Sequence, residues 1–300
     1  MHDDERYLVM EEQAFKRLYP FTSNWLSIDN RRYHYLDEGP RDGPVVVMLH
    51  GNPTWSFYYR TLVSALRGKY RLIVPDHMGC GLSEKPQDYA YTIRQHIQNL
   101  QHLLTQLEIE TSCFFLHDWG GAIGMGYAVQ NPARVNRFVI FNTAAFSMPS
   151  IPWRIRVCRS NILGGFLVRR LNAFARLAMV FGTSRRSHIP SPVKKGYLLP
   201  YDNWRNRIAL HRFVQEIPLE EHHPNQHLLA EIEQGLVRFR HHPMLIIWGG
   251  EDFCFTERHV LPQWRSRFPE ARVRVFKNAG HLVVEDAHEQ IVPLLMDFLP

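Results

Sequence analysis

The sequence contains no long apolar run, no closely paired cysteines and no export signal. Nowhere among its 300 residues do about 18 apolar residues follow one another, so no segment is expected to cross a membrane. The acidic residues 1–15 lack the apolar core of a signal peptide, which predicts a cytoplasmic protein. The four cysteines form no CxxC pair, so we expect reduced thiols rather than disulfides.

Patterns for binding a metal ion or a dinucleotide are also missing. The pairs His222-His223 and His241-His242 lack the i, i+4 spacing and the partner cysteines of a zinc site. The glycine-rich residues 120–126 could suggest a dinucleotide, but the carboxylate of Asp118 just before them would repel a pyrophosphate. We therefore expect no metal, no cofactor and no nucleic-acid partner.

Acidic residues are absent between Ser147 and Tyr201, where eight arginines and two lysines lie. These ten charges exceed the formal net charge of the whole chain, which is +6, so the rest of the chain is net negative. Two interpretations remain open. The arginines form a solvated face, or they contact an anionic membrane or an acidic partner protein.

Short apolar runs alternate with helical patterns along most of the chain. Strands are expected at residues 25–28, 33–36, 45–49, 71–75, 113–116, 138–141, 244–248 and 273–276, and helices at 58–66, 92–107, 261–267 and the segment ending at 298. The first two strands are joined by a tight Asp29-Asn30 turn. This alternation predicts an α/β fold with a mostly parallel, eight-stranded sheet and helices on both faces.

The alternation stops in the middle of the chain. Residues 147–225 show helical patterns but no buried strand, and the alternation resumes afterwards. We interpret residues 147–225 as a helical cap, inserted between a first part of the sheet domain at residues 1–146 and a second part at residues 226–300.

A short strand, a sharp turn and a glycine-rich helix start come together around Asp118. This sequence of elements is typical of the nucleophile elbow of α/β-hydrolases. Glycines at 120 and 121 fit such an elbow, because the helix must pass close to neighbouring strands. The elbow predicts that Asp118 is a nucleophile, and the alternative is a carboxylate that caps the helix.

An elbow of this kind requires an acid and a histidine on loops after later strands. Asp252 follows the strand at 244–248, and His281 follows the strand at 273–276. His281 would be the base, and Asp252 would orient it, although Glu251 stands beside Asp252. A carboxylate nucleophile forms an ester with the substrate and suits displacement at saturated carbon or opening of a strained ring.

Two further residues could hold a developing anion. Trp119 has an indole N–H, and Asn52 offers an amide in the loop after the strand at 45–49. The alternatives are an aromatic core residue at Trp119 and a turn former before Pro53 at Asn52.

Residues 50–55 (HGNPTW) and 117–121 (HDWGG) closely resemble the haloalkane dehalogenases, and the resemblance extends over nearly the whole chain. It implies that Asp118 is the nucleophile, that Asn52 and Trp119 stabilise the halide, and that His281 is the base. Because Asn142 ends the sixth strand where some dehalogenases carry the acid, the resemblance implies Asp252 instead and matches the third dehalogenase subfamily.

Other segments resemble relatives of that subfamily, the β-lactone decarboxylases of long-chain olefin biosynthesis. These segments are residues 76–83 (DHMGCGLS), 142–146 (NTAAF), 206–208 (NRI) and 212–215 (RFVQ). The resemblance implies a long-chain β-lactone as substrate, with a cis-olefin and CO2 as products. Aliphatic residues of the cap suit an apolar substrate, namely Ile162, Leu163, Phe166, Leu167, Val168 and Leu171.

Three alternatives stay open at this point. A haloalkane dehalogenase would give an alcohol and a halide. An epoxide hydrolase would hold the epoxide oxygen with two cap tyrosines, and Tyr197 and Tyr201 lie in the cap, although Asn52 argues against it. A non-catalytic binding protein would leave Asp118, Asp252 and His281 unexplained. Fluoroacetate dehalogenases carry arginine where this chain has Trp119.

Overall fold

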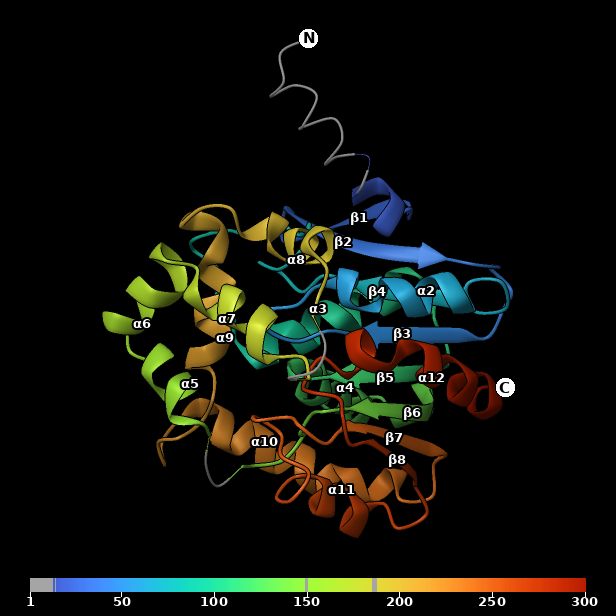
Figure 1. Cartoon of the computed structure of the whole chain (residues 1–300). Coiled ribbons are helices and arrows are strands. Elements are labelled where there is room, and N and C mark those ends of the chain that lie inside the picture. The colour runs from blue at the N-terminus through green and yellow to red at the C-terminus, as the bar shows by residue number, and fades with distance from the viewer. Residues whose placement is uncertain (1–12, 14, 149–150, 185–187) are drawn as a thin grey trace.

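A single mostly parallel sheet forms the centre of the molecule (Figure 1). The computed structural model describes residue 13 and residues 15–148, 151–184 and 188–300. Its sheet has eight strands in the order β1-β2-β4-β3-β5-β6-β7-β8. They are β1 (Ser23–Ile28), β2 (Arg31–Glu38), β3 (Val45–Leu49), β4 (Arg71–Pro75), β5 (Ser112–His117), β6 (Val135–Phe141), β7 (Met244–Gly249) and β8 (Arg272–Phe276). Only β2 runs antiparallel to both of its neighbours.

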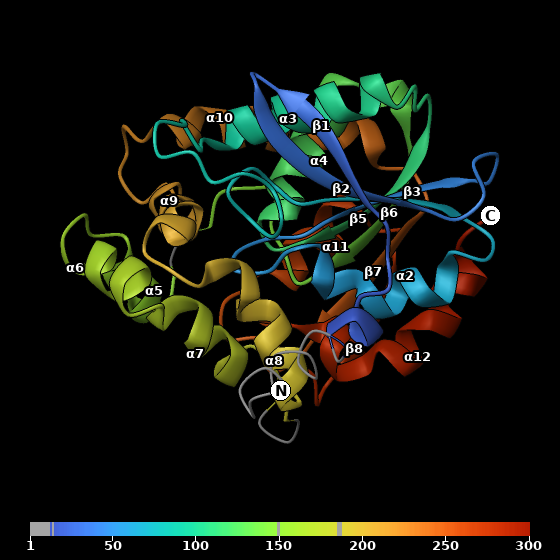
Figure 2. The same ribbon diagram turned by 90° about the horizontal axis from the view of Figure 1, so that it is seen from above.

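Helices cover both faces of the sheet (Figure 2). One face carries α3 (Ile93–Gln106), α4 (Trp119–Gln130), α10 (Pro224–Gly235) and α11 (Leu261–Arg267), whose apolar residues share one core cluster. The other face carries α2 (Arg60–Leu66) and α12 (Val283–Phe298), which share a second cluster. The central strands β3 and β5 are apolar on both faces because both clusters pack against them. The predicted fold class is therefore confirmed.

Five of the helices between β6 and β7 project to one side of the sheet as a separate layer (Figure 1). They are α5 (Trp153–Cys158), α6 (Leu163–Gly165) with its π-helical continuation η3 (Phe166–Arg170), α7 (Ala173–Phe181), α8 (Ser191–Leu198) and α9 (Ile208–Gln215). This layer covers the carboxyl ends of the parallel strands. The domain bounds at 146/147 and 225/226 stay a prediction.

Local signals in the sequence place several elements to within one or two residues. Asp29 and Asn30 both have positive φ and join β1 to β2, as a two-residue hairpin turn requires. The side chain of Thr92 accepts a hydrogen bond from the N–H of Gln95 and so caps α3. The helix expected from residue 58 begins as a 3₁₀ turn, η1 (Ser56–Tyr59), and is α-helical only from Arg60.

Candidate active site

Asp118 lies at the junction of β5 and α4, in a backbone conformation that few residues adopt. Its φ is 50° and its ψ is −126°, so the turn is strained and lifts the carboxylate above the end of the sheet. Glycine neighbours make room for this turn. A Cβ on Gly51 would lie 2.0 Å from Oδ1 of Asp118, and one on Gly120 would lie 2.1 Å from the carbonyl oxygen of Leu49.

His281 stands between two carboxylates. Its Nδ1 donates a hydrogen bond of 2.9 Å to Oδ2 of Asp252, and its Nε2 lies 3.7 Å from Oδ2 of Asp118. The gap to Asp118 is too long for a direct hydrogen bond in this state. His117, the residue before Asp118, donates from Nε2 to the backbone carbonyl of His281 over 3.0 Å and thereby fixes the loop that carries it.

The Asp252 carboxylate is buried and has four hydrogen bonds. Its Oδ1 accepts the N–H groups of Cys254 and Phe255 at 2.6 and 3.0 Å. Its Oδ2 accepts from His281 and, at 2.9 Å, from the side-chain amide of Asn142. Glu251, the competing acid, is exposed and accepts from the hydroxyl of Ser184 instead. The structure therefore places Asp252, and not Glu251, against His281.

The contact between Asn142 and Asp252 was not predicted from the sequence. Asn142 directly follows β6 and has a positive φ. Its side-chain oxygen accepts from the N–H of Gly249 over 2.7 Å, and its side-chain nitrogen donates to the carbonyl of Gly249 over 3.2 Å. The available signal was a lone amide residue at the carboxyl end of a parallel strand, where ligand-binding groups gather.

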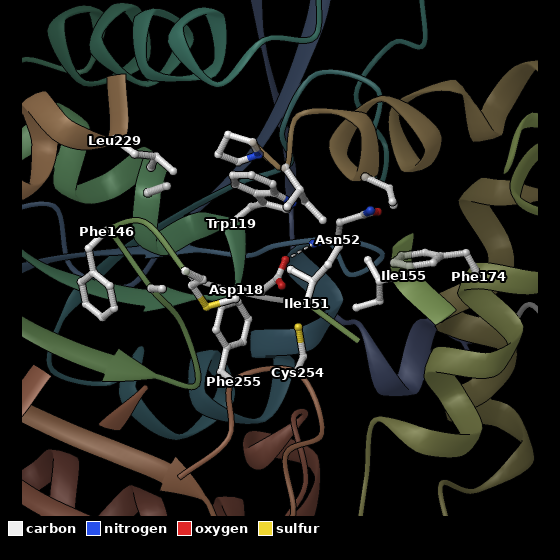
Figure 3. A pocket seen from close by; sticks show the side chains of 16 residues that line it. Asn52, Asp118, Trp119, Phe146, Ile151, Ile155, Phe174, Leu229, Cys254 and Phe255 are labelled. Carbon is white, nitrogen blue, oxygen red and sulfur yellow. Dashed lines mark hydrogen bonds between the residues drawn. The ribbon is translucent and has the colours of Figure 1, made fainter. Parts of the chain in front are cut away.

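Asn52 contacts both Asp118 and the cap. Its backbone N–H donates to Oδ1 of Asp118 over 2.7 Å (Figure 3), and its side-chain amide donates to the carbonyl of Leu210 on α9 over 2.9 Å. The backbone N–H of Trp119 also lowers the pKa of the Asp118 carboxyl, because it stabilises the ionised form. Two N–H groups therefore face one carboxylate, which is the arrangement of an oxyanion hole.

At Asp118 and at His281 alike, burial and neighbouring charges shift the pKa in opposite directions. Burial raises the pKa of the Asp118 carboxyl, and the partly opposing effects are those of His281 and the N–H groups of Asn52 and Trp119. Burial by itself lowers the pKa of His281, but the carboxylates of Asp252 and Asp118 outweigh it, so the pKa of His281 is raised. His281 therefore holds its proton to a higher pH than an ordinary histidine.

A cavity of about 750 Å³, counted with its open mouth, lies over Asp118 between the cap and the sheet domain. Its walls are almost entirely apolar. The lining residues are Asn52, Asp118, Trp119, Ala122, Ala144, Phe146, Met148, Ile151, Ile155, Phe174, Val214, Ile217, Pro218, Leu229, Cys254 and Phe255. In Figure 3, Phe146 and Leu229 lie on one side of Asp118, and Ile155 and Phe174 lie on the other.

Tyr197 and Tyr201 do not form the pair that an epoxide hydrolase needs. The hydroxyl of Tyr197 donates to Glu285, and the hydroxyl of Tyr201 donates to the carbonyl of Thr54 over 3.3 Å. Both rings are fully buried, and neither is among the described residues that line the cavity. The two tyrosines therefore hold the cap on the sheet domain.

Fold and site together define an enzyme of the α/β-hydrolase type. Residues 44–287 match the family model described as the alpha/beta hydrolase fold, and the chain belongs to that family. The chain is similar to members of two groups of enzymes.

The first group is represented by a cis-3-alkyl-4-alkyloxetan-2-one decarboxylase of Shewanella oneidensis. The chain is 43% identical to it, over 94% of this chain and 89% of that protein.

Haloalkane dehalogenases are the other group of similar proteins. A haloalkane dehalogenase 2 of Mycobacterium bovis is 32% identical, over 94% of this chain and 96% of that protein. A solved haloalkane dehalogenase of Bradyrhizobium elkani superposes with a TM-score of 0.85 at 21% identity, covering 92% of this chain and 97% of its own. That structural likeness concerns the fold.

No helix within the described ranges combines the length and the apolar character needed to cross a bilayer.

Proposed function

We propose that the protein decarboxylates cis-3,4-dialkyl β-lactones to cis-alkenes and CO2, with Asp118 as a covalent nucleophile. The observation that carries the proposal is a lone carboxylate with apolar walls on both of its sides. A substrate with a small polar ring and two alkyl substituents fits this arrangement. The ring would lie at Asp118, and one substituent would lie toward Phe146 and Leu229, the other toward Ile155 and Phe174. The 43% identity to a decarboxylase of such lactones supports the same substrate class.

The first step is the attack of Asp118 on ring carbon C4. The bond between C4 and the ring oxygen breaks, the Asp118–C4 ester bond forms, and the former lactone carboxylate is released on C3. Ring strain favours this displacement at saturated carbon. Attack from the face opposite the ring oxygen inverts C4 and leaves the ester and the new carboxylate anti to each other.

The second step regenerates Asp118. The bond between C3 and the carboxylate carbon breaks to give CO2, its electron pair forms the C3–C4 double bond, and the Asp118–C4 bond breaks. Inversion followed by anti loss keeps the two alkyl groups on the same side, so a cis-lactone yields a cis-alkene. No water is consumed. Protonated His281, 3.7 Å from Oδ2, would stabilise the departing Asp118 carboxylate.

A haloalkane dehalogenase is the second candidate. It is favoured by the presence of Trp119 and Asn52 in the cavity wall and by the 32% identity to a dehalogenase. In that cycle, neutral His281 would activate water against the Asp118 ester. The N–H groups of Asn52 and Trp119 would hold the resulting oxyanion.

The two cycles differ in their use of water, which allows a direct test. The protein is incubated in ¹⁸O-water with a long-chain cis-β-lactone, and products are identified by gas chromatography with mass spectrometry. We expect cis-alkene and CO2, with the Asp118 peptide unlabelled after many turnovers. A β-hydroxy acid as the main product, with ¹⁸O in Asp118, would refute the decarboxylase proposal and support hydrolysis.

Parallel incubations with 1-bromobutane and styrene oxide test the other candidate substrates. Asp118→Ala is the matched control, because it leaves the cavity intact and removes the nucleophile. Turnover of the lactone by this variant at more than a few per cent of the wild-type rate would show that Asp118 is not the nucleophile. In His281→Gln, 1-bromobutane should leave a butyl ester on the Asp118 peptide, detected by its added mass.

A further inference from the structure

The outer surface of the cap exposes an unusual concentration of large apolar side chains. Among the described residues, 14 such side chains are exposed, and eight of them lie in a segment of about a tenth of the chain. Isolated exposed apolar residues are normal on protein surfaces, whereas a cluster of this kind indicates an interaction site. The eight are Trp153, Ile162, Leu163, Phe166, Leu171, Leu177, Val180 and Phe181. The sequence suggested that four of them, Ile162, Leu163, Phe166 and Leu171, suit the substrate, but they are exposed and do not line the cavity over Asp118.

Four exposed arginines lie among them, at positions 154, 156, 170 and 176. Within the described ranges, no carboxylate forms an ion pair with any of the four. The guanidinium of Arg154 lies 5.7 Å from the ring of Trp153 and 5.3 Å from the ring of Phe181, so charge and apolar surface are interleaved. We call the eight apolar side chains and these four arginines the cap patch.

The helices that carry the cap patch lie on the side of the cap that faces away from the sheet (Figure 2). They are α5, α6, η3 and α7, with the turns between them. Ile162, in the turn between α5 and α6, is 88% exposed, and Trp153 at the start of α5 is 71% exposed. Protruding side chains of this kind can enter a soft medium, whereas a folded protein partner would need a matching hollow.

We propose that the cap patch binds an anionic lipid surface. Helices that lie in a bilayer interface combine aromatic and aliphatic side chains on one side with arginines that reach the headgroups. The four arginines supply the attraction to acidic headgroups, and the protruding apolar side chains supply insertion. The absence of acidic residues from Ser147 to Tyr201 removes the repulsion that an anionic surface would otherwise meet.

The helices of the cap patch also form part of the cavity wall. Ile155 lies on α5 and Phe174 lies on α7, and both line the cavity over Asp118. Binding through the outer side of these helices would place the site beside the bilayer. A dialkyl lactone could then pass from lipid into the cavity without crossing bulk water. This delivery role rests on the proposed function, whereas membrane binding does not.

Vesicle flotation of the full chain tests the proposal. One set of vesicles contains phosphatidylglycerol and phosphatidylcholine, and the other contains phosphatidylcholine alone, each at low and at high salt. We expect binding to the anionic vesicles that weakens as salt rises, and at least about tenfold less binding to the neutral vesicles.

Two variants separate the apolar and the charged contributions. Ile162→Asp/Phe166→Asp removes insertion, and Arg154→Gln/Arg156→Gln/Arg170→Gln removes charge while keeping a polar side chain. Each should weaken binding to anionic vesicles about tenfold or more. The matched control is Val237→Asp/Arg240→Gln, which changes an exposed apolar residue and an exposed arginine of the sheet domain and should bind as the wild type does.

Three results would overturn the proposal. The wild type binds no vesicles, it binds both kinds of vesicle equally, or the cap-patch variants bind as well as the wild type does. Absent binding would leave the cap patch to an acidic protein. Failure of the proposed function is recognised separately. Without vesicles, a short water-soluble cis-β-lactone should give the same rate of alkene formation with wild type and cap-patch variants. A missing alkene product would refute the decarboxylase activity whatever the vesicles show.

Discussion

The side-chain amide of Asn142 donates a 2.9 Å hydrogen bond to Oδ2 of Asp252, the same oxygen that accepts from His281. Asn142 also bonds the backbone of Gly249 on β7, so it ties the end of β6 to the loop that carries the acid. Asp252 is thereby held from one side by a neutral donor and from the other by the imidazole. Asn142 is a positioning residue for His281, and it acts through Asp252.

Asn142→Ala should lower kcat by about 10- to 100-fold with little change in KM, because the orientation of Asp252 is lost while the cavity stays intact. Steady-state kinetics over a pH series measure this. The variant should also show a shifted pH profile, since His281 titrates beside a less firmly held carboxylate. Unchanged kcat and an unchanged pH profile in a folded variant would contradict the positioning role.

Replacement of the two adjacent acids should have very different effects. Asp252→Asn leaves the geometry but removes the charge that fixes the tautomer of His281, and it should slow turnover by up to about 10⁴-fold. Glu251→Gln should have a mild effect, because Glu251 is exposed and bonds Ser184 rather than His281. Rates of both variants on one substrate, with far-ultraviolet circular dichroism as the folding control, decide between them. The reverse order would transfer the acid role to Glu251.

The pH dependence should distinguish decarboxylation from hydrolysis. Decarboxylation needs ionised Asp118 and is assisted by protonated His281, whose pKa is raised above its ordinary value of about 6.5. Its kcat should therefore fall as the pH rises through the raised pKa of His281, and again as the pH falls through the pKa of Asp118. Hydrolysis of an Asp118 ester needs neutral His281, so its rate should rise with pH over the same upper range. A lactone profile that rises there would contradict the proposed role of His281.

Substitutions at the two ends of the cavity should change the preference for each alkyl substituent separately. Leu229→Trp fills the end near Phe146, and Ile155→Trp fills the end near Phe174. Each variant should lower kcat/KM about tenfold or more for lactones with two long chains. A lactone whose shortened chain lies at the filled end should keep its activity with that variant. Competition between lactones shortened at C3 or at C4 measures this. Identical responses of the two variants would show that the substituents do not occupy opposite ends.

The features that sequence predicted correctly are local. Runs such as residues 45–49 are apolar without interruption because both faces of a central parallel strand are covered. The elbow at Asp118 was predictable because a strained turn next to packed strands needs its glycines in fixed positions. The placement of Asp252 and His281 near Asp118 was predictable for a similar reason, since each lies in the loop after a strand of the parallel sheet.

The contacts that sequence did not predict join distant residues. Asn142 and Asp252 are 110 positions apart, and Asn52 and Leu210 are 158 positions apart. Such pairs depend on how the cap and the loops pack, which no local pattern encodes. The same holds for Tyr197 and Tyr201, whose hydroxyls bond Glu285 and Thr54 on the sheet domain.

The two hydrogen bonds of Asn52 join the cap to Asp118 through a single residue. One residue donates its side-chain amide to the Leu210 carbonyl of the cap and its backbone N–H to Asp118. If one of these bonds strengthens the other through the position of Asn52, the reverse effect has the same coupling free energy. A free Asp118 carboxylate is a stronger acceptor than an ester, so esterification of Asp118 would weaken its bond to Asn52 and, through Asn52, the contact with Leu210. In the proposed cycle the cap would therefore be held more firmly by Asn52 when Asp118 is free than while the substrate is attached to it.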